Sequence, residues 1–148
     1  YHIVYNETLR DRICAVSNKT HYNEMNVLSM HALIGAYQPQ GYEWVDELNQ
    51  VLAGNIECFC DYVDGHFEGV SYSRPQGTYM VFLDCTEWCR EHGRDIQWLL
   101  DEGARVGVGY QDGRPFHGPC HIRVNLALPL SRVKEACDRL DRYVFNAR

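Results

Sequence analysis

The chain has 148 residues, of which 45% are hydrophobic and 23% charged, a composition typical of one ordinary globular domain with its own core. A formal net charge of −6 gives no electrostatic reason to expect a nucleic-acid partner. No apolar run approaches the roughly 20 residues that span a bilayer, so no membrane partner is expected.

The first half of the chain is predicted to be mainly helical. Residues 1–5 indicate a short strand, and residues 8–16 a short helix or turn. Helical spacing returns over residues 26–37 and is interrupted by Pro39 and Gly41. A longer helix follows and ends at Gly65, with one stripe that we expect to face the core. The stripe consists of Trp44, Leu48, Val51, Leu52, Asn55, Ile56, Phe59, Tyr62 and Val63.

The second half mixes strands and helices. Strands are predicted at residues 70–72, 78–83, 106–108 and 120–128, with a glycine- and proline-rich loop over 109–119. Asp95 is expected to cap a helix that Gly103 stops, and Ser131 to cap the last helix. This order favours an α+β fold, in which a small, mostly antiparallel sheet is covered on one face by helices.

The seven cysteines do not indicate a metal site. Their number is odd, no Cys-x-x-Cys pair occurs, and the one mixed cluster (His117, Cys120, His121) lacks the four regularly spaced ligands of zinc. We therefore expect no metal ligands. Thiols that act as small apolar residues fit a reducing cytoplasm, and the start at Tyr1 without a basic leader indicates a processed protein or a piece of a longer one.

The strand over residues 120–128 carries the most informative pattern. With a period of two, Ile122, Val124 and Leu126 share one face, and His121, Arg123 and Asn125 the other. An arginine with no acidic neighbour in its strand offers a planar fork for a carboxylate or phosphate, and the 109–119 loop could close over such an anion. The alternative is an edge strand whose polar face meets water. The sequence has no motif typical of a catalytic nucleophile, metal or phosphate site, so no catalytic residue is expected.

Three segments in order resemble the C-terminal part of fold-type-I pyridoxal-phosphate enzymes, in the class I/II aminotransferase family and its cystathionine β-lyase branch of C–S lyases. They are residues 36–37 with 42–48, residues 75–79 with 83–84, and residues 122–127 with 129–131. The likeness extends from Tyr1 to about Phe145. It implies a small domain over residues 26–148, preceded in residues 1–25 by a remnant of the large domain and a connector.

The resemblance also implies roles for single residues. Arg123 matches the arginine that holds the α-carboxylate of an amino-acid substrate, with Asn125 as a neighbour that shapes the pocket. Tyr79, in the 75–79 turn, would lie near the substrate mouth. The full-length enzyme would be a homodimer that binds pyridoxal 5′-phosphate and acts as an aminotransferase or a C–S β-lyase.

The chain departs from the family at the cofactor. The lysine that joins the cofactor would lie a few residues before Tyr1, and the two lysines present, Lys19 and Lys134, stand in other contexts. A fragment without that lysine is expected to be inactive and free of cofactor. Many members of the family it resembles also carry Pro-Gly where this chain has Val108-Gly109.

Two other interpretations remain open from the sequence. The first is a free-standing α+β module that binds a small carboxylate through Arg123 and the 109–119 loop. The second is a structural or interaction domain in which Arg123 faces solvent.

Overall fold

The structure, a computed structural model, describes residues 3–21 and 24–147, which fall into two compact units over residues 1–45 and 46–148. The first unit holds α1 (Glu7–Thr20), α2 (Val27–Ala36) and the start of α3 (Pro39–His66). Both predicted short helices are thus confirmed. Asparagine caps each of them: the Asn6 side chain accepts a bond from the backbone of Leu9, and Asn26 one from Ser29, both at 2.9 Å.

The strand predicted over residues 1–5 is wrong where the structure describes it. Residues 3–5 form no regular secondary structure and pair with no strand among the described residues, and residues 1 and 2 lie outside them. A β-prone run alone therefore did not suffice, because a strand also needs a neighbour to satisfy its backbone.

Helix α3 begins earlier than predicted. Pro39 is its first residue, where the missing N–H and fixed φ are favourable, so the predicted interruption at Pro39 and Gly41 is wrong. At Gly41 a Cβ would lie 2.0 Å from the carbonyl oxygen of Ala36, so this close approach requires glycine. The predicted core stripe holds only in the second half of α3, because Trp44 and Val51 are more than half exposed. The buried residues of α3 are Asn55, Phe59, Cys60 and Val63.

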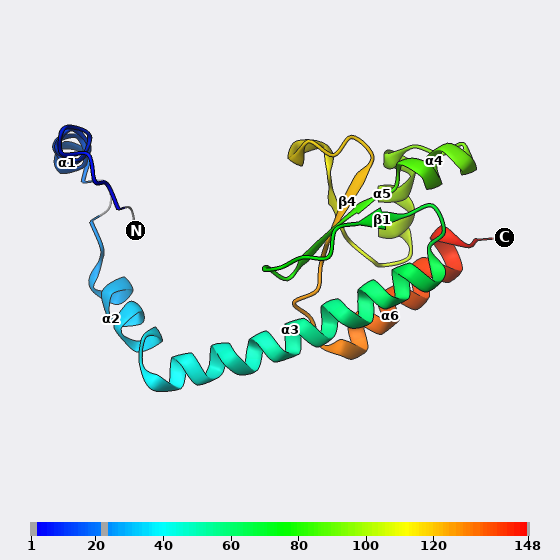
Figure 1. The fold of residues 1–148 in the computed structure, drawn as a ribbon, viewed down its shortest axis with the longest axis horizontal. Helices are drawn as coiled ribbons and strands as arrows, with labels where there is room; N and C mark the ends of the chain where they lie inside the picture. The colour runs from blue at the N-terminus through cyan, green and yellow to red at the C-terminus, as the bar shows by residue number, and fades with distance from the viewer. Residues whose placement is uncertain (1–2, 22–23, 148) are drawn as a thin grey trace. The chain divides into compact units, whose positions relative to one another are not determined.

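The second unit is built on a four-stranded antiparallel sheet in the order β1-β2-β4-β3 (Figure 1). The strands are β1 (Ser71–Tyr72), β2 (Met80–Asp84), β4 (His121–Asn125) and β3 (Gln111–Asp112). In this register Arg123 of β4 stands opposite Phe82 on one side and Gln111 on the other. Strand β4 is therefore an inner strand.

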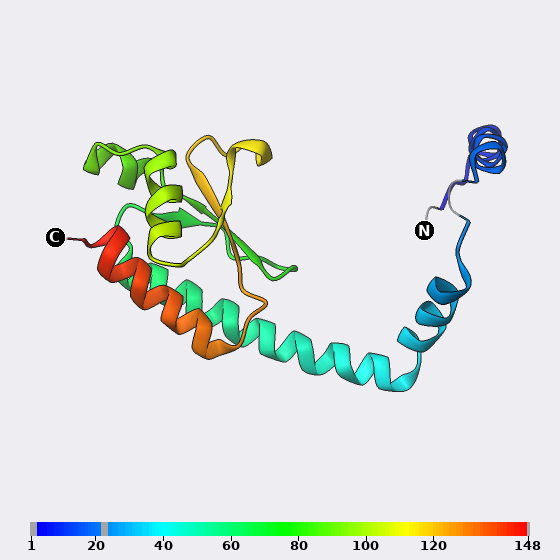
Figure 2. The same ribbon diagram turned by 180° about the vertical axis from the view of Figure 1, so that it is seen from behind.

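Helices cover one face of this sheet, as predicted. The face consists of Val81, Leu83, Ile122 and Val124, all buried, while the residues that alternate with them are at least partly exposed. The covering elements besides α3 are α4 (Thr86–His92), α5 (Ile96–Arg105), α6 (Leu130–Leu140) and the π-helical turn η2 (Asp141–Phe145). Figures 1 and 2 show α3 and α6 side by side, where the hydroxyl of Tyr62 donates to Asp138 and Asp141. The predicted α+β fold is confirmed.

The cysteines in this unit behave mostly as apolar core residues. Cys60, Cys85, Cys89 and Cys137 are buried and free. Burial raises the pKa of the Cys89 and Cys137 thiols to about 12, because the charged thiolate is poorly solvated there. Within the described ranges no helix is long and apolar enough to cross a membrane.

Several boundaries in the second half differ from those predicted. Helix α4 was not predicted, and α5 runs past Gly103 to Arg105. The strand expected at 106–108 is wrong, because Gly107 has φ of 77° and this segment turns at the end of α5. Strand β4 ends at Asn125 rather than at 128, and Ser131 makes no cap for α6. Asp95 is the N-cap of α5, as predicted, and accepts a bond from the backbone of Trp98 at 2.8 Å.

Gly103 lies within α5, and the ring of Tyr110 packs on it. A Cβ at this position would lie 2.5 Å from the ring carbon Cζ, so Gly103→Ala is expected to lower the free energy of unfolding by about 1–3 kcal/mol. Gly65→Ala is a matched control in α3, where the added methyl group meets open space and is expected to be neutral or stabilising. Urea unfolding of both variants checks the prediction, which equal stabilities would contradict.

Candidate functional site

The candidate site is centred on Arg123, on the sheet face opposite the core. Gln111 accepts a hydrogen bond at 2.6 Å from Nε of Arg123 through its side-chain oxygen Oε1. The guanidinium carbon of Arg123 lies 4.0 Å from the centre of the Phe116 ring, a cation–π contact. The side chain is thus held at one edge and over one surface of its plane.

The charge of Arg123 is not neutralised by the described part of the chain. No Asp or Glu there lies within ion-pair distance of it, and its two terminal nitrogens make no hydrogen bond within that part. Arg114 and Arg139, by contrast, pair with Asp112 and Glu135. The free edge of the Arg123 fork can therefore receive both oxygens of a carboxylate.

His121 and Asp84 lie across from one another on the same sheet face. Nε2 of His121 is 3.8 Å from Oδ2 of Asp84, and the His121 ring lies 4.7 Å from that of Phe82. Asp84 also accepts bonds from Thr86, at 2.9 Å from its backbone nitrogen and 2.5 Å from its hydroxyl. Partial burial alone would raise the pKa of Asp84, but the bonds from Thr86 and the nearness of His121 outweigh it and lower this pKa.

This carboxyl group predicts a pH dependence of stability. A carboxyl group whose pKa is lower in the folded than in the unfolded chain stabilises the fold at pH values above its unfolded-state pKa. This stabilisation is lost as the pH falls through the folded-state pKa. We therefore expect the stability difference between the wild type and Asp84→Asn to be larger at about pH 7 than at about pH 3, which lies below the ordinary carboxyl pKa. Urea unfolding at both pH values measures it, and a difference that does not change with pH would contradict the prediction.

The loop from Gly113 to Pro119 is packed closely against β4. The backbone of Gly113 donates to the carbonyl of His121 at 2.9 Å, and Gly118 to that of Gly113 at 3.0 Å. A Cβ on Gly113 would lie 2.4 Å from the His121 carbonyl oxygen, and one on Gly118 would lie 2.5 Å from the Phe82 ring. Both positions therefore require glycine, and the short helix η1 (Arg114–Phe116) between them carries the ring that contacts Arg123.

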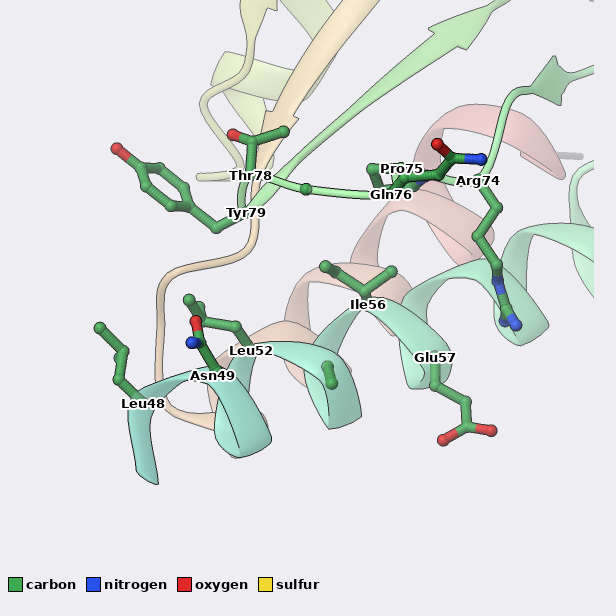
Figure 3. A pocket seen from close by; sticks show the side chains of 12 residues that line it. Leu48, Asn49, Leu52, Ile56, Glu57, Arg74, Pro75, Gln76, Thr78 and Tyr79 are labelled. Carbon is green, nitrogen blue, oxygen red and sulfur yellow. The ribbon is translucent and has the colours of Figure 1, made fainter. Parts of the chain in front are cut away.

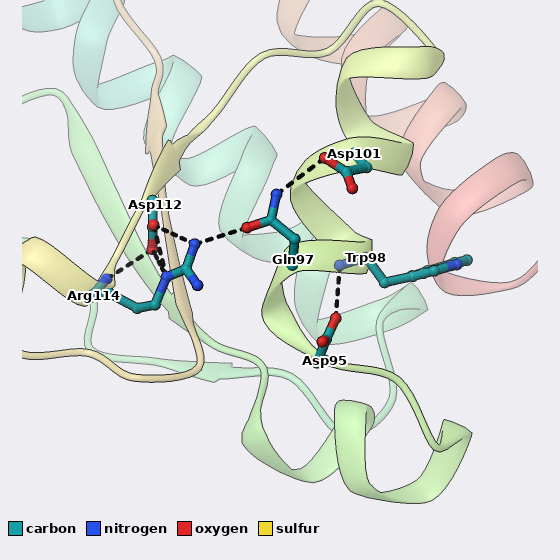
Figure 4. Close-up of polar contacts among 6 residues, drawn as sticks. All are labelled: Asp95, Gln97, Trp98, Asp101, Asp112 and Arg114. Atoms are coloured by element: carbon teal, nitrogen blue, oxygen red, sulfur yellow. Dashed lines mark hydrogen bonds and ion pairs between the residues drawn. The ribbon is translucent and has the colours of Figure 1, made fainter.

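Arg114 fastens this loop to α5. Its guanidinium donates to both carboxylate oxygens of Asp112, at 2.7 and 3.0 Å from Nε, and to the side-chain oxygen of Gln97 at 2.9 Å. Gln97 donates in turn to Asp101 at 3.1 Å (Figure 4). The hydrogen bonds from Arg114 lower the pKa of Asp112, because they favour its charged form.

The three predicted binding residues make no side-chain hydrogen bond to one another in the described part of the chain, although Asn125 shares a face of β4 with Arg123 and the carbonyl of Tyr79 accepts a bond at 2.9 Å from the backbone of Leu126. Asn125 follows Arg123 on β4, but its side-chain oxygen accepts a bond from the backbone of Ala127 at 2.8 Å, and the residue borders a cavity of about 350 Å³ beside α6. Tyr79 lies at one end of a groove of about 620 Å³ between α3 and the 74–79 turn, with Arg74 at the other end (Figure 3). The side chains in contact with Arg123 are instead Gln111 and Phe116, which the sequence patterns did not single out.

Comparison with known proteins places the fold in a family. No protein-family profile matches the chain. A Mycobacterium leprae protein named "Putative cystathionine beta-lyase" is 35% identical over an aligned length of 124 residues, and the match covers 73% of this chain and 30% of that protein. The C–S lyase of Staphylococcus hominis, solved with pyridoxal phosphate bound, superimposes with a TM-score of 0.79 at 24% identity, over 94% of this chain and 36% of the other. Cystalysin of Treponema denticola superimposes with a TM-score of 0.80 at 22% identity, over 94% of this chain and 35% of the other.

The chain belongs to the fold-type-I aminotransferase family. It spans about a third of the length of the curated relatives it matches. Its α+β fold is that of the family's C-terminal small domain, which confirms the resemblance predicted from the three sequence segments.

Proposed function

We propose that this aminotransferase-family domain belongs to a pyridoxal-phosphate-dependent aminotransferase or C–S β-lyase and that Arg123 binds the α-carboxylate of its amino-acid substrate. The observation that carries the proposal is the state of Arg123, a charged fork on the open face of the sheet. Its Nε is held by the neutral Gln111, and no carboxylate of the described residues pairs with its other edge. Such an edge suits two-point binding of a carboxylate.

The proposal assigns the two parts of the chain different origins. Residues 26–148 are the small domain, and residues 1–25 are a remnant of the large domain and a connector. The missing large domain is then the main partner of this chain, within a cytoplasmic homodimer. Asn125 and Tyr79 border the substrate pocket of that assembly, from the end of β4 and from the 74–79 groove.

The chain's own residues fit substrate binding rather than cofactor binding. Pyridoxal phosphate withdraws electrons from bonds at the α-carbon of an amino acid, and it needs a lysine to hold it. Lys134 is exposed on α6, which covers the other face of the sheet, and Lys19 is exposed near the end of α1. The role left to this chain is to bind and orient the substrate carboxylate, and alone it is expected to be inactive.

The source of the cofactor lysine tests the proposal directly. The full-length protein from the same gene would be purified, reduced with borohydride to fix the cofactor covalently, and mapped by mass spectrometry. We expect the label on a lysine encoded shortly upstream of Tyr1. A label on Lys19 or Lys134, or a gene that begins at or just before Tyr1, would overturn the proposal.

Titration of the 148-residue chain alone separates the proposal from a free-standing carboxylate-binding module. Calorimetry with amino acids and keto acids, without cofactor, is expected to give no micromolar binding, because Arg123 alone supplies too few contacts. Micromolar binding that Arg123→Ala abolishes would instead identify a free-standing module.

A further inference from the structure

Gln111, on the neighbouring strand β3, holds the Nε edge of the Arg123 guanidinium. The antiparallel register of β3 and β4 sets Gln111 directly opposite Arg123, so the two side chains share a sheet face. The 2.6 Å bond to Nε fixes the rotation of the guanidinium about its long stem. Because the amide of Gln111 is neutral, it holds Arg123 without cancelling its positive charge.

Phe116 restrains the same group in the remaining direction. Its ring lies 4.0 Å from the guanidinium carbon, and contact with a ring face fixes the tilt of a planar cation. An arginine side chain that must be ordered on binding pays conformational entropy of its own. An Arg123 already held at Nε and against a ring loses less of that freedom when a ligand arrives.

Both restraints come from one segment that is itself fixed. Gln111 and Phe116 flank Asp112 and Arg114, and the Arg114 side chain ties this segment to Gln97 of α5 (Figure 4). The glycine contacts with β4 hold its other end. The segment 111–118 is thus held in place at both ends, and its contacts keep the Arg123 guanidinium in one orientation.

We propose that Gln111 is a positioning residue for substrate binding, which presents the two terminal nitrogens of Arg123 end-on to the substrate carboxylate; this inference rests on the proposed function. Since Nε is occupied by Gln111, a two-point contact is left to the terminal nitrogens. The neutrality of Gln111 matters as much as its hydrogen bond. A carboxylate at this position would form an ion pair with Arg123 and compete with the substrate.

Two variants with opposite chemistry test this inference in the full-length cofactor-loaded protein. Calorimetry measures the affinity for L-alanine and for L-alaninamide, which lacks the carboxylate. Gln111→Leu is expected to weaken L-alanine binding about tenfold, since a hydrogen bond to a charged group is lost, and to leave L-alaninamide binding unchanged. Gln111→Glu is expected to weaken L-alanine binding further, with recovery as the pH falls through the pKa of the introduced carboxyl group.

The controls distinguish failure of this inference from failure of the proposed function. Gln50→Glu makes the same change at an exposed position on α3 and is expected to leave both affinities unchanged. Unchanged L-alanine affinity in both Gln111 variants, or equal losses for L-alanine and L-alaninamide, would overturn the positioning role. If Arg123→Ala also leaves L-alanine affinity unchanged, the proposed function fails as well. If Arg123→Ala abolishes it, only the role of Gln111 fails.

Discussion

Arg123→Ala in the full-length protein is expected to weaken binding of an amino-acid substrate by roughly 2–5 kcal/mol, which is about a 30- to 4,000-fold increase in KM. The substitution removes the whole guanidinium, which has no carboxylate of the described residues within ion-pair distance. Absorbance of the bound cofactor is expected to stay unchanged, because no part of the cofactor's attachment depends on this side chain in the proposal. Steady-state kinetics and absorbance spectra measure the two effects.

Two further arginine variants make this result specific. Arg123→Lys keeps the positive charge but loses the planar fork, so an intermediate KM is expected. Arg94→Ala removes an exposed arginine whose guanidinium carbon lies 4.8 Å from the centre of the Trp98 ring, on the side of α5, and KM is expected to stay at the wild-type value. An unchanged KM in Arg123→Ala would argue against its role in carboxylate binding.

Asn55→Leu is expected to lower the free energy of unfolding by about 2–4 kcal/mol. Asn55 is buried in α3, and its amide nitrogen donates to the carbonyls of Leu126 and Leu128, both at 2.8 Å. Leucine fills a similar volume but donates nothing, so both carbonyls would lose this partner. Equilibrium unfolding in urea measures the change.

The matched control for Asn55 lies on the same helix. Gln50→Leu makes the same kind of polar-to-apolar change at an exposed position and is expected to alter the unfolding free energy by less than about 0.5 kcal/mol. Comparable stabilities for the two variants would show that the Asn55 amide is not needed. Because its acceptors lie in the segment between β4 and α6, the loss should also shift the end of β4, where Asn125 lies.

The central strand was predictable because its pattern is local. The alternation through Ile122, Arg123 and Val124 correctly assigns one face to the core and the other to the open side. The apolar spacing of α3 likewise predicts a helix, yet it gave no sign that Trp44 and Val51 are exposed. Periodicity tells which residues share a face, whereas what covers that face depends on the rest of the fold.

The contacts of Arg123 were not predictable, for a reason that lies in the sheet. Strand β3 has two residues, and its place beside β4 depends on a pairing between segments that no local propensity encodes. The β-prone run Val106-Gly107-Val108 led to a strand being predicted there rather than at β3. No strand forms at that run, because Gly107 adopts a left-handed conformation and the chain turns. The 109–119 loop was singled out for its glycines and prolines, but nothing in its sequence marked Gln111 or Phe116 as contacts of Arg123.

Arg123 lies on an inner strand, whereas the two residues that hold its guanidinium lie at the edge of the sheet. The strand that carries Arg123, β4, is paired with β2 on one side and with β3 on the other. It therefore belongs to the part of the domain that is expected to open last and to exchange its amide hydrogens most slowly. Gln111 and Phe116 come from a short edge strand and a surface turn, where substitutions disturb folding little. Substitutions of Gln111 or Phe116 are therefore expected to change how the Arg123 guanidinium is held without loosening the strand that bears it.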